Sequence, residues 1–474
     1  MKTLDRYVIR SFLVAAVLWL LILIALRIVV DLFVNMDEFA KLGLPFNEMM
    51  QHIVRYYSYQ SLVYFMELGG IGIVAAAAFT LARMNHTNEL TAILASGVSL
   101  HRVVWPLVLI AVLMGGMIVG DQELIVPRVG DKLVRTRDDL PGTREFKVTL
   151  VNDAQGAVFW APRFRPEQGE MTSPMLHIRD VREDGQGGYR ALAAVSAHRA
   201  YPGTLDGRSG WVFHEAVLMR TLSTDKAWEN MPDTQRVYTY VGPAAIFKAA
   251  KQDYERREGK PMPEVQAIRD ARARIQDSQY DLLIEAERFV APAEGTLDPT
   301  AKEAGRLIKP RFTFASPEGV VLGTFFADEA TWDPKSPTAW KLKGGRLFRE
   351  SDLDTRYLVL RQSGRWLNLM STQQLSELIQ LKRLPDPRPA ILTLHTRFTD
   401  PINNLVMLLL ALPFILSRER GIKTSAARCL LMVSIFYVSI YVCRYVGLPP
   451  EWAAWLPILT FGPLAMVLMD SVKT

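Results

Sequence analysis

The stretch LARMNHTNELTAILASGVSLHRVVWPL, at residues 81–107, decides the fold of this 474-residue chain. It is a polar segment with a long apolar run on each side. Thr87 or Asn88 is placed to cap the start of a helix. Glu89 follows in the first turn, where the helix dipole favours a negative charge. We therefore expect a short surface helix at residues 87–99, between two membrane spans.

This expected helix carries one apolar stripe. Its members lie at i, i+3, i+4 and i+7 and are Leu90, Ile93, Leu94 and Gly97. A loop between two spans has no need of an amphipathic helix unless another molecule docks on it. The stripe therefore indicates a membrane protein that is driven by a partner at this surface.

Apolar stretches on both sides of this helix predict six transmembrane spans, since about 20 apolar residues cross a bilayer. Three precede a long polar middle and three follow it, at residues 11–35, 57–82, 103–120, 397–417, 425–444 and 452–470. The first apolar run is too long for a signal peptide, and no small-residue cleavage site follows it. We expect it to be a retained span.

Basic residues set the expected orientation, because cytoplasmic loops are enriched in lysine and arginine. With the N-terminus inside, ten basic residues lie on the inner side and three, Lys41, Arg55 and Arg444, on the outer side. We therefore expect both termini in the cytoplasm. The membrane halves are residues 1–120 and 395–474, and residues 121–394 form a large external domain.

The external domain shows short alternating strands separated by turn residues, which predicts a sandwich, a jelly roll or an open curved sheet. Residues 243–307 differ, because they contain two charged, alanine-rich segments of helical pattern. We expect one or two helices inserted in the β-domain, as a solvated surface excursion or as a docking element. The fold class is a six-span helical bundle, three plus three, with a jelly-roll-like external domain.

Charged residues within the spans are costly in hydrocarbon and are therefore functional candidates. Arg27 lies in the outer half of the first span, and an ion pair with Asp31, four residues later, is the simpler explanation. Arg55, Arg397 and Arg444 also lie near the outer ends of spans. With Arg27 they are candidates for a basic ring that binds lipid phosphate. Ordinary anchoring at the interface is the alternative for each of them.

Glu67 is the other charge within a span, and Gly69, Gly70 and Gly72 follow it. Small residues indicate close helix packing, within the chain or against a second subunit. We expect Glu67 to be paired inside the bundle rather than to carry protons.

The sequence predicts no catalytic residues, no metal site and no cofactor. Its seven histidines have no metal-binding spacing, and no hydrolase motif is present. No basic block with interleaved aromatics indicates nucleic-acid binding. The phosphate-binding GxxxxGK[ST] motif is missing too. Any ATP-driven work therefore requires an ATPase on another chain.

Four segments resemble the permease subunits of the lipopolysaccharide-export ABC transporter, the LptF/LptG (YjgP/YjgQ) family. They are LDRYVIRSF at 4–12, NELTAILASGVS at 88–99, HTRFTDP at 395–401 running into LLLALPF at 408–414, and GLPP at 447–450. The likeness is slightly greater to the LptG type, chiefly at the two ends. The external domain is larger than is usual in the family, and the helical insertion accounts for much of the excess.

The resemblance implies a partnership and a substrate. Such permeases pair with a second related permease and with a dimer of a cytoplasmic ABC ATPase. They draw lipopolysaccharide from the outer leaflet of the bacterial inner membrane and pass it to a periplasmic bridge protein. Residues 87–99 would be the coupling helix that seats in the ATPase. Glu89 would be a polar contact there, with Leu90 and Leu94 as the buried face, and Arg27 would lie near the lipid headgroup.

Two other functions compete with a permease. A membrane-anchored receptor or sensor would bind a ligand with its external β-domain and signal through the inner helix. A membrane-bound enzyme acting on envelope glycans would need an acidic or nucleophilic set of residues in the β-domain, and the sequence shows none. The permease and the receptor differ in which molecule binds residues 87–99, so identifying that molecule distinguishes them.

Overall fold

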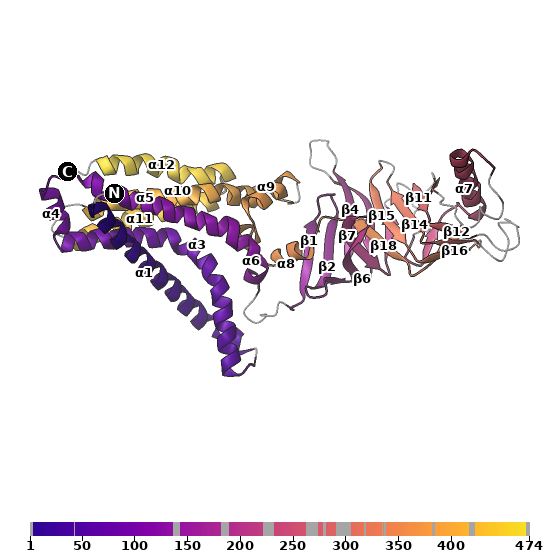
Figure 1. The fold of residues 1–474 in the computed structure, drawn as a ribbon, viewed down its shortest axis with the longest axis horizontal. Coiled ribbons are helices and arrows are strands. Elements are labelled where there is room, and N and C mark those ends of the chain that lie inside the picture. The colour runs from indigo at the N-terminus through magenta and orange to yellow at the C-terminus, as the bar shows by residue number, and fades with distance from the viewer. Residues whose placement is uncertain are drawn as a thin grey trace. The chain divides into compact units, whose positions relative to one another are not determined.

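The computed structural model divides the chain into two compact units, a membrane unit at residues 1–141 and 360–474 and a β unit at residues 142–359 (Figure 1). The residues described are 3–41, 43–135, 143–181, 189–220, 232–261, 274–277, 281–290, 305–316, 319–333, 335, 338–381, 384–416 and 422–470.

Helices make up the membrane unit. In chain order they are α1 (Thr3–Val34), α2 (Met36–Ala40), α3 (Phe46–His86), α4 (Glu89–Ala95), α5 (Leu100–Gly120), the π-helix η1 (Asp121–Ile125), α6 (Val126–Leu133), the 3-10 helix η2 (Trp366–Leu369), α9 (Thr372–Gln380), α10 (Arg388–Leu416), α11 (Ile422–Tyr445) and α12 (Pro450–Asp470). Helix α8 (Thr355–Leu360) lies at the point in the sequence where the β unit ends and the membrane unit resumes.

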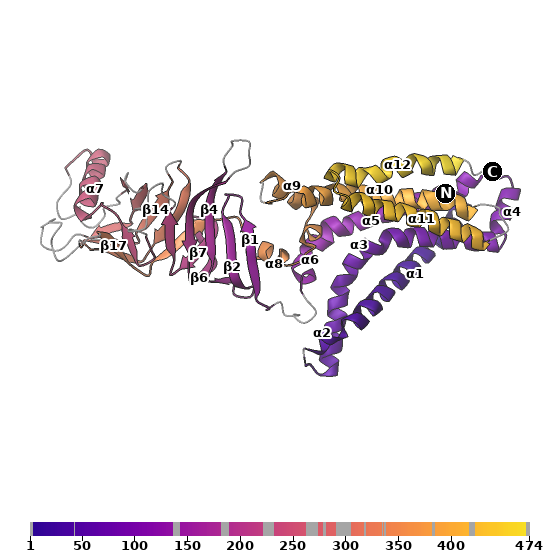
Figure 2. The same ribbon diagram turned by 180° about the vertical axis from the view of Figure 1, so that it is seen from behind.

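Six of these helices, within the described residues, are long and apolar enough to cross a membrane. The six-span bundle, three helices before the β unit and three after it, is therefore confirmed. Each expected span overlaps one of these helices; residue 417, at the end of the fourth, lies outside the described residues. The long spans α3, α5 and α10 lie alongside one another in both views, and α1 packs against α3 but diverges from α5 and α10 (Figures 1 and 2).

The external domain differs from its expected bounds of 121–394. Residues 121–141 and 360–394 belong to the membrane unit. The physical reason is that α5 continues directly through η1 into α6, and that α9 packs against α10. Hydropathy marks where the apolar run ends, but it does not show that the helix goes on beyond it.

Glycines on α3 explain why the bundle packs closely. A Cβ at Gly69 would lie 2.5 Å from Ile118 Cδ1 on α5, and a Cβ at Gly70 would overlap the Asn404 side chain on α10. Both partners are in the same chain. The glycines therefore serve packing within the subunit, one of the two alternatives that the sequence left open.

Antiparallel strands form the β unit and confirm the predicted β-rich domain. They are β1 (Phe146–Asn152), β2 (Val158–Arg165), β3 (Glu170–Thr172), β4 (Met175–Val181), β5 (Tyr189–Ser196), β6 (Arg199–Leu205), β7 (Arg208–His214), β8 (Val217–Arg220), β9 (Arg236–Tyr238), β10 (Arg274–Asp277), β11 (Leu282–Glu285), β12 (Arg288–Val290), β13 (Arg306–Ile308), β14 (Arg311–Ala315), β15 (Val321–Phe326), β16 (Glu329–Asp333), β17 (Ala339–Lys343) and β18 (Arg346–Glu350).

Two sheets share these strands. One has the order β10-β11-β14-β15-β18-β7-β6-β3-β2-β4-β5-β8, with β1 paired to β2, and the other has the order β12-β13-β16-β17-β9. The chain passes between the sheets at two-residue corners, from β11 to β12, β13 to β14, β15 to β16 and β17 to β18. Alternate positions point inward, so the fully buried aromatic side chains include Trp211, Phe213, Phe312 and Phe325 on the first sheet and Trp340 on the second.

The helical insertion is confirmed at α7 (Pro243–Glu258), which ends at Gly259 with a left-handed φ of 64°. The prediction of a second helix within residues 243–307 is wrong at Arg274–Asp277, because these residues form strand β10, which pairs with β11. Residues 262–273, 278–280 and 291–304 of that range lie outside the described residues. Pairing with β11 outweighs the helical preference of the alanine- and arginine-rich segment before it.

Candidate functional site

Helix α4 stands between the two long spans α3 and α5 and lies at one end of the bundle (Figure 1). Asn88 and Gly97 flank it with left-handed φ values of 56° and 81°. These two residues reverse the chain on either side of the helix. Gly97 is thus a turn residue, where glycine has no steric cost, rather than a member of the apolar stripe.

The stripe on α4 faces the chain's own bundle. Leu90 is 5% exposed and belongs to the main core cluster of the spans, and Ile93 and Leu94 are half-buried against that cluster. The sequence pattern predicts that a docking partner covers this stripe. The structure differs because a short helix beside a bundle buries its apolar face there first. The opposite face, which carries Thr91, Ala92 and Ala95, is the exposed one.

Glu89 at the start of α4 already has partners within the chain. Tyr7 donates a hydrogen bond of 2.6 Å to Glu89 Oε2, and the Thr87 hydroxyl donates one of 2.9 Å to Oε1. The Tyr7 bond, then the Thr87 bond and the nearby Arg83 charge, lower the pKa of Glu89. Glu89 is therefore an anion that its own chain holds. No side chain caps α4, so the expected capping by Thr87 or Asn88 is not observed.

Arg27 lies in the C-terminal half of α1, against α3. Its guanidinium is over the ring of Tyr64, 5.4 Å from the ring centroid, and the residue is exposed. One turn further along α1, Asp31 accepts a hydrogen bond of 2.8 Å from the Tyr57 hydroxyl. Arg55, two residues before Tyr57, is exposed as well. Helix α3 thus supplies aromatic partners to the charges of the first span.

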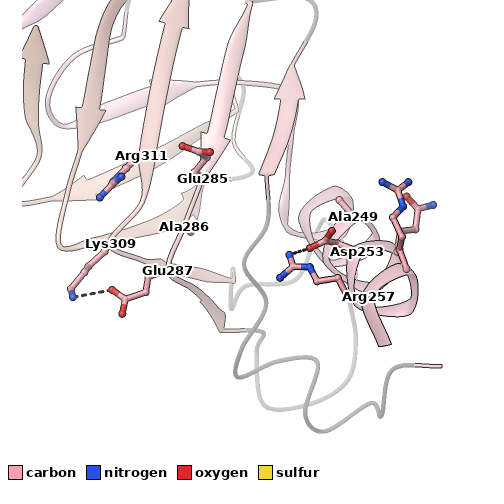
Figure 3. Close-up of a pocket in the computed structure, with 10 residues that line it drawn as sticks. Ala249, Asp253, Arg257, Glu285, Ala286, Glu287, Lys309 and Arg311 are labelled. Atoms are coloured by element: carbon pink, nitrogen blue, oxygen red, sulfur yellow. Dashed lines mark hydrogen bonds and ion pairs between the residues drawn. The ribbon is translucent and has the colours of Figure 1, made fainter. Parts of the chain in front are cut away.

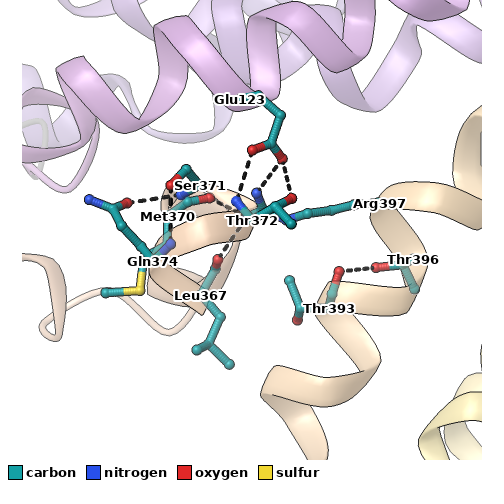
Figure 4. Close-up of polar contacts among 9 residues, drawn as sticks. All are labelled: Glu123, Leu367, Met370, Ser371, Thr372, Gln374, Thr393, Thr396 and Arg397. Atoms are coloured by element: carbon teal, nitrogen blue, oxygen red, sulfur yellow. Dashed lines mark hydrogen bonds and ion pairs between the residues drawn. The ribbon is translucent and has the colours of Figure 1, made fainter. Parts of the chain in front are cut away.

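Arg397 is buried rather than available to a lipid, since its side chain is 2% exposed. Its Nη1 donates to Glu123 Oε1 at 2.7 Å, and its Nη2 donates to the carbonyl oxygens of Leu367 and Met370. Glu123 also accepts hydrogen bonds from the Thr372 amide at 2.8 Å and from its hydroxyl at 2.6 Å (Figure 4). The ion pair ties η1 and α10 to the segment that begins α9.

The start of α9 is fixed by a capping box. The Ser371 hydroxyl accepts from the Gln374 amide at 3.2 Å, and Gln374 Oε1 accepts from the Ser371 amide at 2.9 Å (Figure 4). Reciprocal bonds of this kind satisfy amides that the first helical turn leaves unpaired. They hold Thr372 in place to donate to Glu123.

Arg444, the fourth member of the expected ring, forms an ion pair with Asp400 on α10. Two of the four arginines are thus neutralised by carboxylates of the same chain, while Arg27 and Arg55 are exposed. The structure therefore does not bring four available cations together in a ring. Arg27 and Arg55 are therefore better candidates for contact with a lipid phosphate than Arg397 and Arg444.

Glu67 has the partner that the sequence could not identify. Arg365, in the segment before η2, lies 2.6 Å from Glu67 Oε1. The two residues are 298 positions apart, so no spacing rule relates them. Glu123, Tyr7 and Arg365 all lacked a sequence signal, because each acts through a contact between distant segments.

A cavity of about 750 Å³ lies between α7 and the strands that face it (Figure 3). None of the predicted site residues lines it. Among its lining residues, Asp253 pairs with Arg257 on α7 and Glu287 pairs with Lys309 opposite. Arg311 pairs with Asp206, which does not line the cavity. Within the described residues, no group of three or more His, Cys, Asp or Glu side chains is placed to hold a metal ion.

Comparison with known protein families gives one match, which covers nearly the whole chain. The model described as lipopolysaccharide export system permease LptF/LptG matches residues 6–470, and so spans both the membrane unit and the β unit. A comparison with curated proteins found no match.

Proposed function

Because the chain belongs to the LptF/LptG family of lipopolysaccharide export permeases, we propose that it extracts lipopolysaccharide, or a related glycolipid, from the inner membrane. A separate cytoplasmic ABC ATPase, present as a dimer, supplies the energy, and a periplasmic bridge protein receives the lipid. Family membership makes the chain a multi-pass inner-membrane transporter component rather than an enzyme. It also places the chain in a transport system with other Lpt components.

The observation that carries this proposal is α4. It is a seven-residue helix between two spans, it is held to the bundle by Leu90, and it turns a face of small residues outward. Small side chains let another protein approach the helix closely. We propose that the ATPase docks on Thr91, Ala92 and Ala95, with Leu90, Ile93 and Leu94 anchoring the helix beneath it.

Two further proposals concern topology and pairing. The ten-to-three distribution of basic residues favours cytoplasmic termini, which would place α4 in the cytoplasm and the β unit in the periplasm. Helices α1 and α11 are the least buried of the six candidate spans. Their exposed apolar side chains fit lipid and a second, related permease.

Purification in a mild detergent tests the function. We expect a tagged chain to bring down an ABC ATPase and a second permease, and we expect lipopolysaccharide to stimulate ATP hydrolysis in the purified complex. Mass spectrometry identifies the subunits, and phosphate release measures the activity. The absence of any ATPase would contradict the permease function and favour the receptor alternative, in which the external β-domain binds a ligand.

Arg27→Ala tests the lipid contact. We expect the complex to assemble, but the lipopolysaccharide concentration for half-maximal ATPase stimulation to rise roughly tenfold, since one charge-assisted contact is worth about 1.5 kcal/mol. Arg27→Lys keeps the charge and is the matched control, with a smaller expected shift. Unchanged stimulation in Arg27→Ala would leave Arg27 with only its structural contact to Tyr64.

A further inference from the structure

A chain of side-chain hydrogen bonds joins three helices at the end of the bundle that carries α4. Tyr7 on α1 donates to Glu89 on α4 at 2.6 Å. Arg83, near the end of α3, donates to the Ser11 hydroxyl at 2.7 Å and to the Tyr7 hydroxyl at 3.4 Å. Thr87 donates to the other oxygen of Glu89 at 2.9 Å. The Tyr7 hydroxyl thus links the anion of α4 to the cation of α3.

These bonds add a side-chain restraint to a short helix. Residues 87–88 connect α4 to α3 and residues 96–99 connect it to α5, and each turn contains one left-handed residue, Asn88 or Gly97. A seven-residue helix between two such turns is held against the bundle by Leu90, with Ile93 and Leu94 half-buried beside it. The bond from Tyr7 is a side-chain hydrogen bond between α1 and α4, and it ties the start of α4 to α1.

The network contributes orientation more than stability. Tyr7 is 43% exposed, and hydrogen bonds and charge pairs in water add little to the free energy of folding. Its charges balance, because the Glu89 anion and the Arg83 cation flank a neutral phenol. An exposed, balanced network that joins three helices is suited to transmitting a displacement.

Helix α1 can carry such a displacement across the membrane. It runs without a break from Thr3 to Val34, so Tyr7 and Arg27 are on one helix, about 30 Å apart at 1.5 Å per residue. The outer parts of α1 and α3, together with α2, form a small core of their own, built on Phe39, Tyr57 and Tyr64, which is separate from the main cluster. That part of the hairpin can shift as one piece.

We infer that Tyr7 is a positioning residue that couples the docking helix α4 to α1 through Glu89. Displacement of α4 by the ATPase then moves α1 as well, and with α1 the arginine at its outer part. The inference rests on the proposed function, since it assumes that α4 is the docking element. It assigns to Glu89 an acceptor role within the chain in addition to any contact with the ATPase.

Tyr7→Phe removes the donor and keeps the ring, so it isolates the hydrogen bond. In the purified complex we expect normal amounts of bound ATPase and unchanged ATP hydrolysis without lipid, but a severalfold loss of stimulation by lipopolysaccharide. Tyr240→Phe, which changes an exposed tyrosine of the β unit, is the matched control and retains full stimulation. Glu89→Gln keeps an acceptor and should lose less than Glu89→Ala.

A double-mutant cycle and a distance measurement complete the test. Tyr7→Phe combined with Glu89→Ala should be no worse than Glu89→Ala alone, because both remove the same bond. Spin labels at Arg10→Cys on α1 and Ala95→Cys on α4, with Cys429 and Cys443 replaced by serine, should give a broader distance distribution in the Tyr7→Phe permease. Wild-type stimulation and an unbroadened distribution in Tyr7→Phe would overturn the inference.

The distance measurement needs only the purified permease. It therefore separates failure of this inference from failure of the proposed function. Broadening without any copurifying ATPase would support the link between α1 and α4 while contradicting the docking role of α4.

Discussion

Glu123→Gln is expected to destabilise the membrane unit more than any substitution of an exposed charge. Arg397 is 2% exposed, and Glu123 is the carboxylate that neutralises it, at 2.7 Å. Removing one partner of a buried ion pair leaves an uncompensated charge, at a cost of about 3–5 kcal/mol. Because glutamine still accepts hydrogen bonds from Thr372 and Arg397, we expect about 3 kcal/mol, near the lower limit.

Thermal denaturation of the purified chain in detergent, followed by tryptophan fluorescence, measures this loss. Asp37→Asn is the matched control, because the Asp37–Lys41 pair is exposed on both sides and should contribute about 1 kcal/mol at most. The combination of Glu123→Leu with Arg397→Met removes both charges and should recover much of the stability. A melting temperature for Glu123→Gln equal to that of Asp37→Asn would contradict the structural role of this pair.

Arg397 also illustrates what the sequence could and could not predict. Hydropathy places Arg397 at the outer end of a span, and the span is correct. A charge in that place is explained equally well by a lipid phosphate and by a carboxylate of the same protein. The carboxylate is Glu123, 274 positions earlier, on a π-helical turn that follows α5. Neither the turn nor the contact has a sequence pattern, so the partner could not be predicted.

The spans were predictable for the opposite reason. About 20 apolar residues are needed wherever a helix crosses a bilayer, and this requirement depends on local composition alone. The same holds for α7, whose alanine-rich pattern is local. Prediction from local composition fails at Arg274–Asp277, because this segment is a strand through its pairing with a distant segment, Leu282–Glu285.

Helix α4 lies between these cases. Periodicity correctly identifies Leu90, Ile93 and Leu94 as one face, because helical geometry fixes which residues lie together. It does not tell what covers that face. The chain's own spans compete with a partner for the same apolar surface, and being covalently linked they have the advantage. A docking partner would then bind the opposite side of α4, and a search for hydrophobic residues alone does not identify that side.

Ala92→Arg is therefore expected to weaken docking of the ATPase more than tenfold while leaving the permease folded. Ala92 is exposed at the centre of the outward face of α4, between Thr91 and Ala95. A long charged side chain there would hold the partner away from the helix. A loss of about 2 kcal/mol of binding free energy corresponds to more than a tenfold fall in affinity. Affinity purification followed by quantification of the ATPase subunit measures it.

The comparison that decides between the two faces of α4 is Ala92→Arg against Leu90→Asp. If the outward face binds the ATPase, Ala92→Arg loses the ATPase and keeps the melting temperature of the permease. Leu90→Asp lowers the melting temperature as well, because Leu90 is buried in the bundle. Ala154→Arg, an exposed substitution in a turn of the β unit, is the control for added charge and should change neither. If the Ala92→Arg permease retains all of its ATPase, the outward face is not the docking surface. The ATPase would then bind the stripe of Leu90, Ile93 and Leu94, and α4 would have to leave the bundle to expose it.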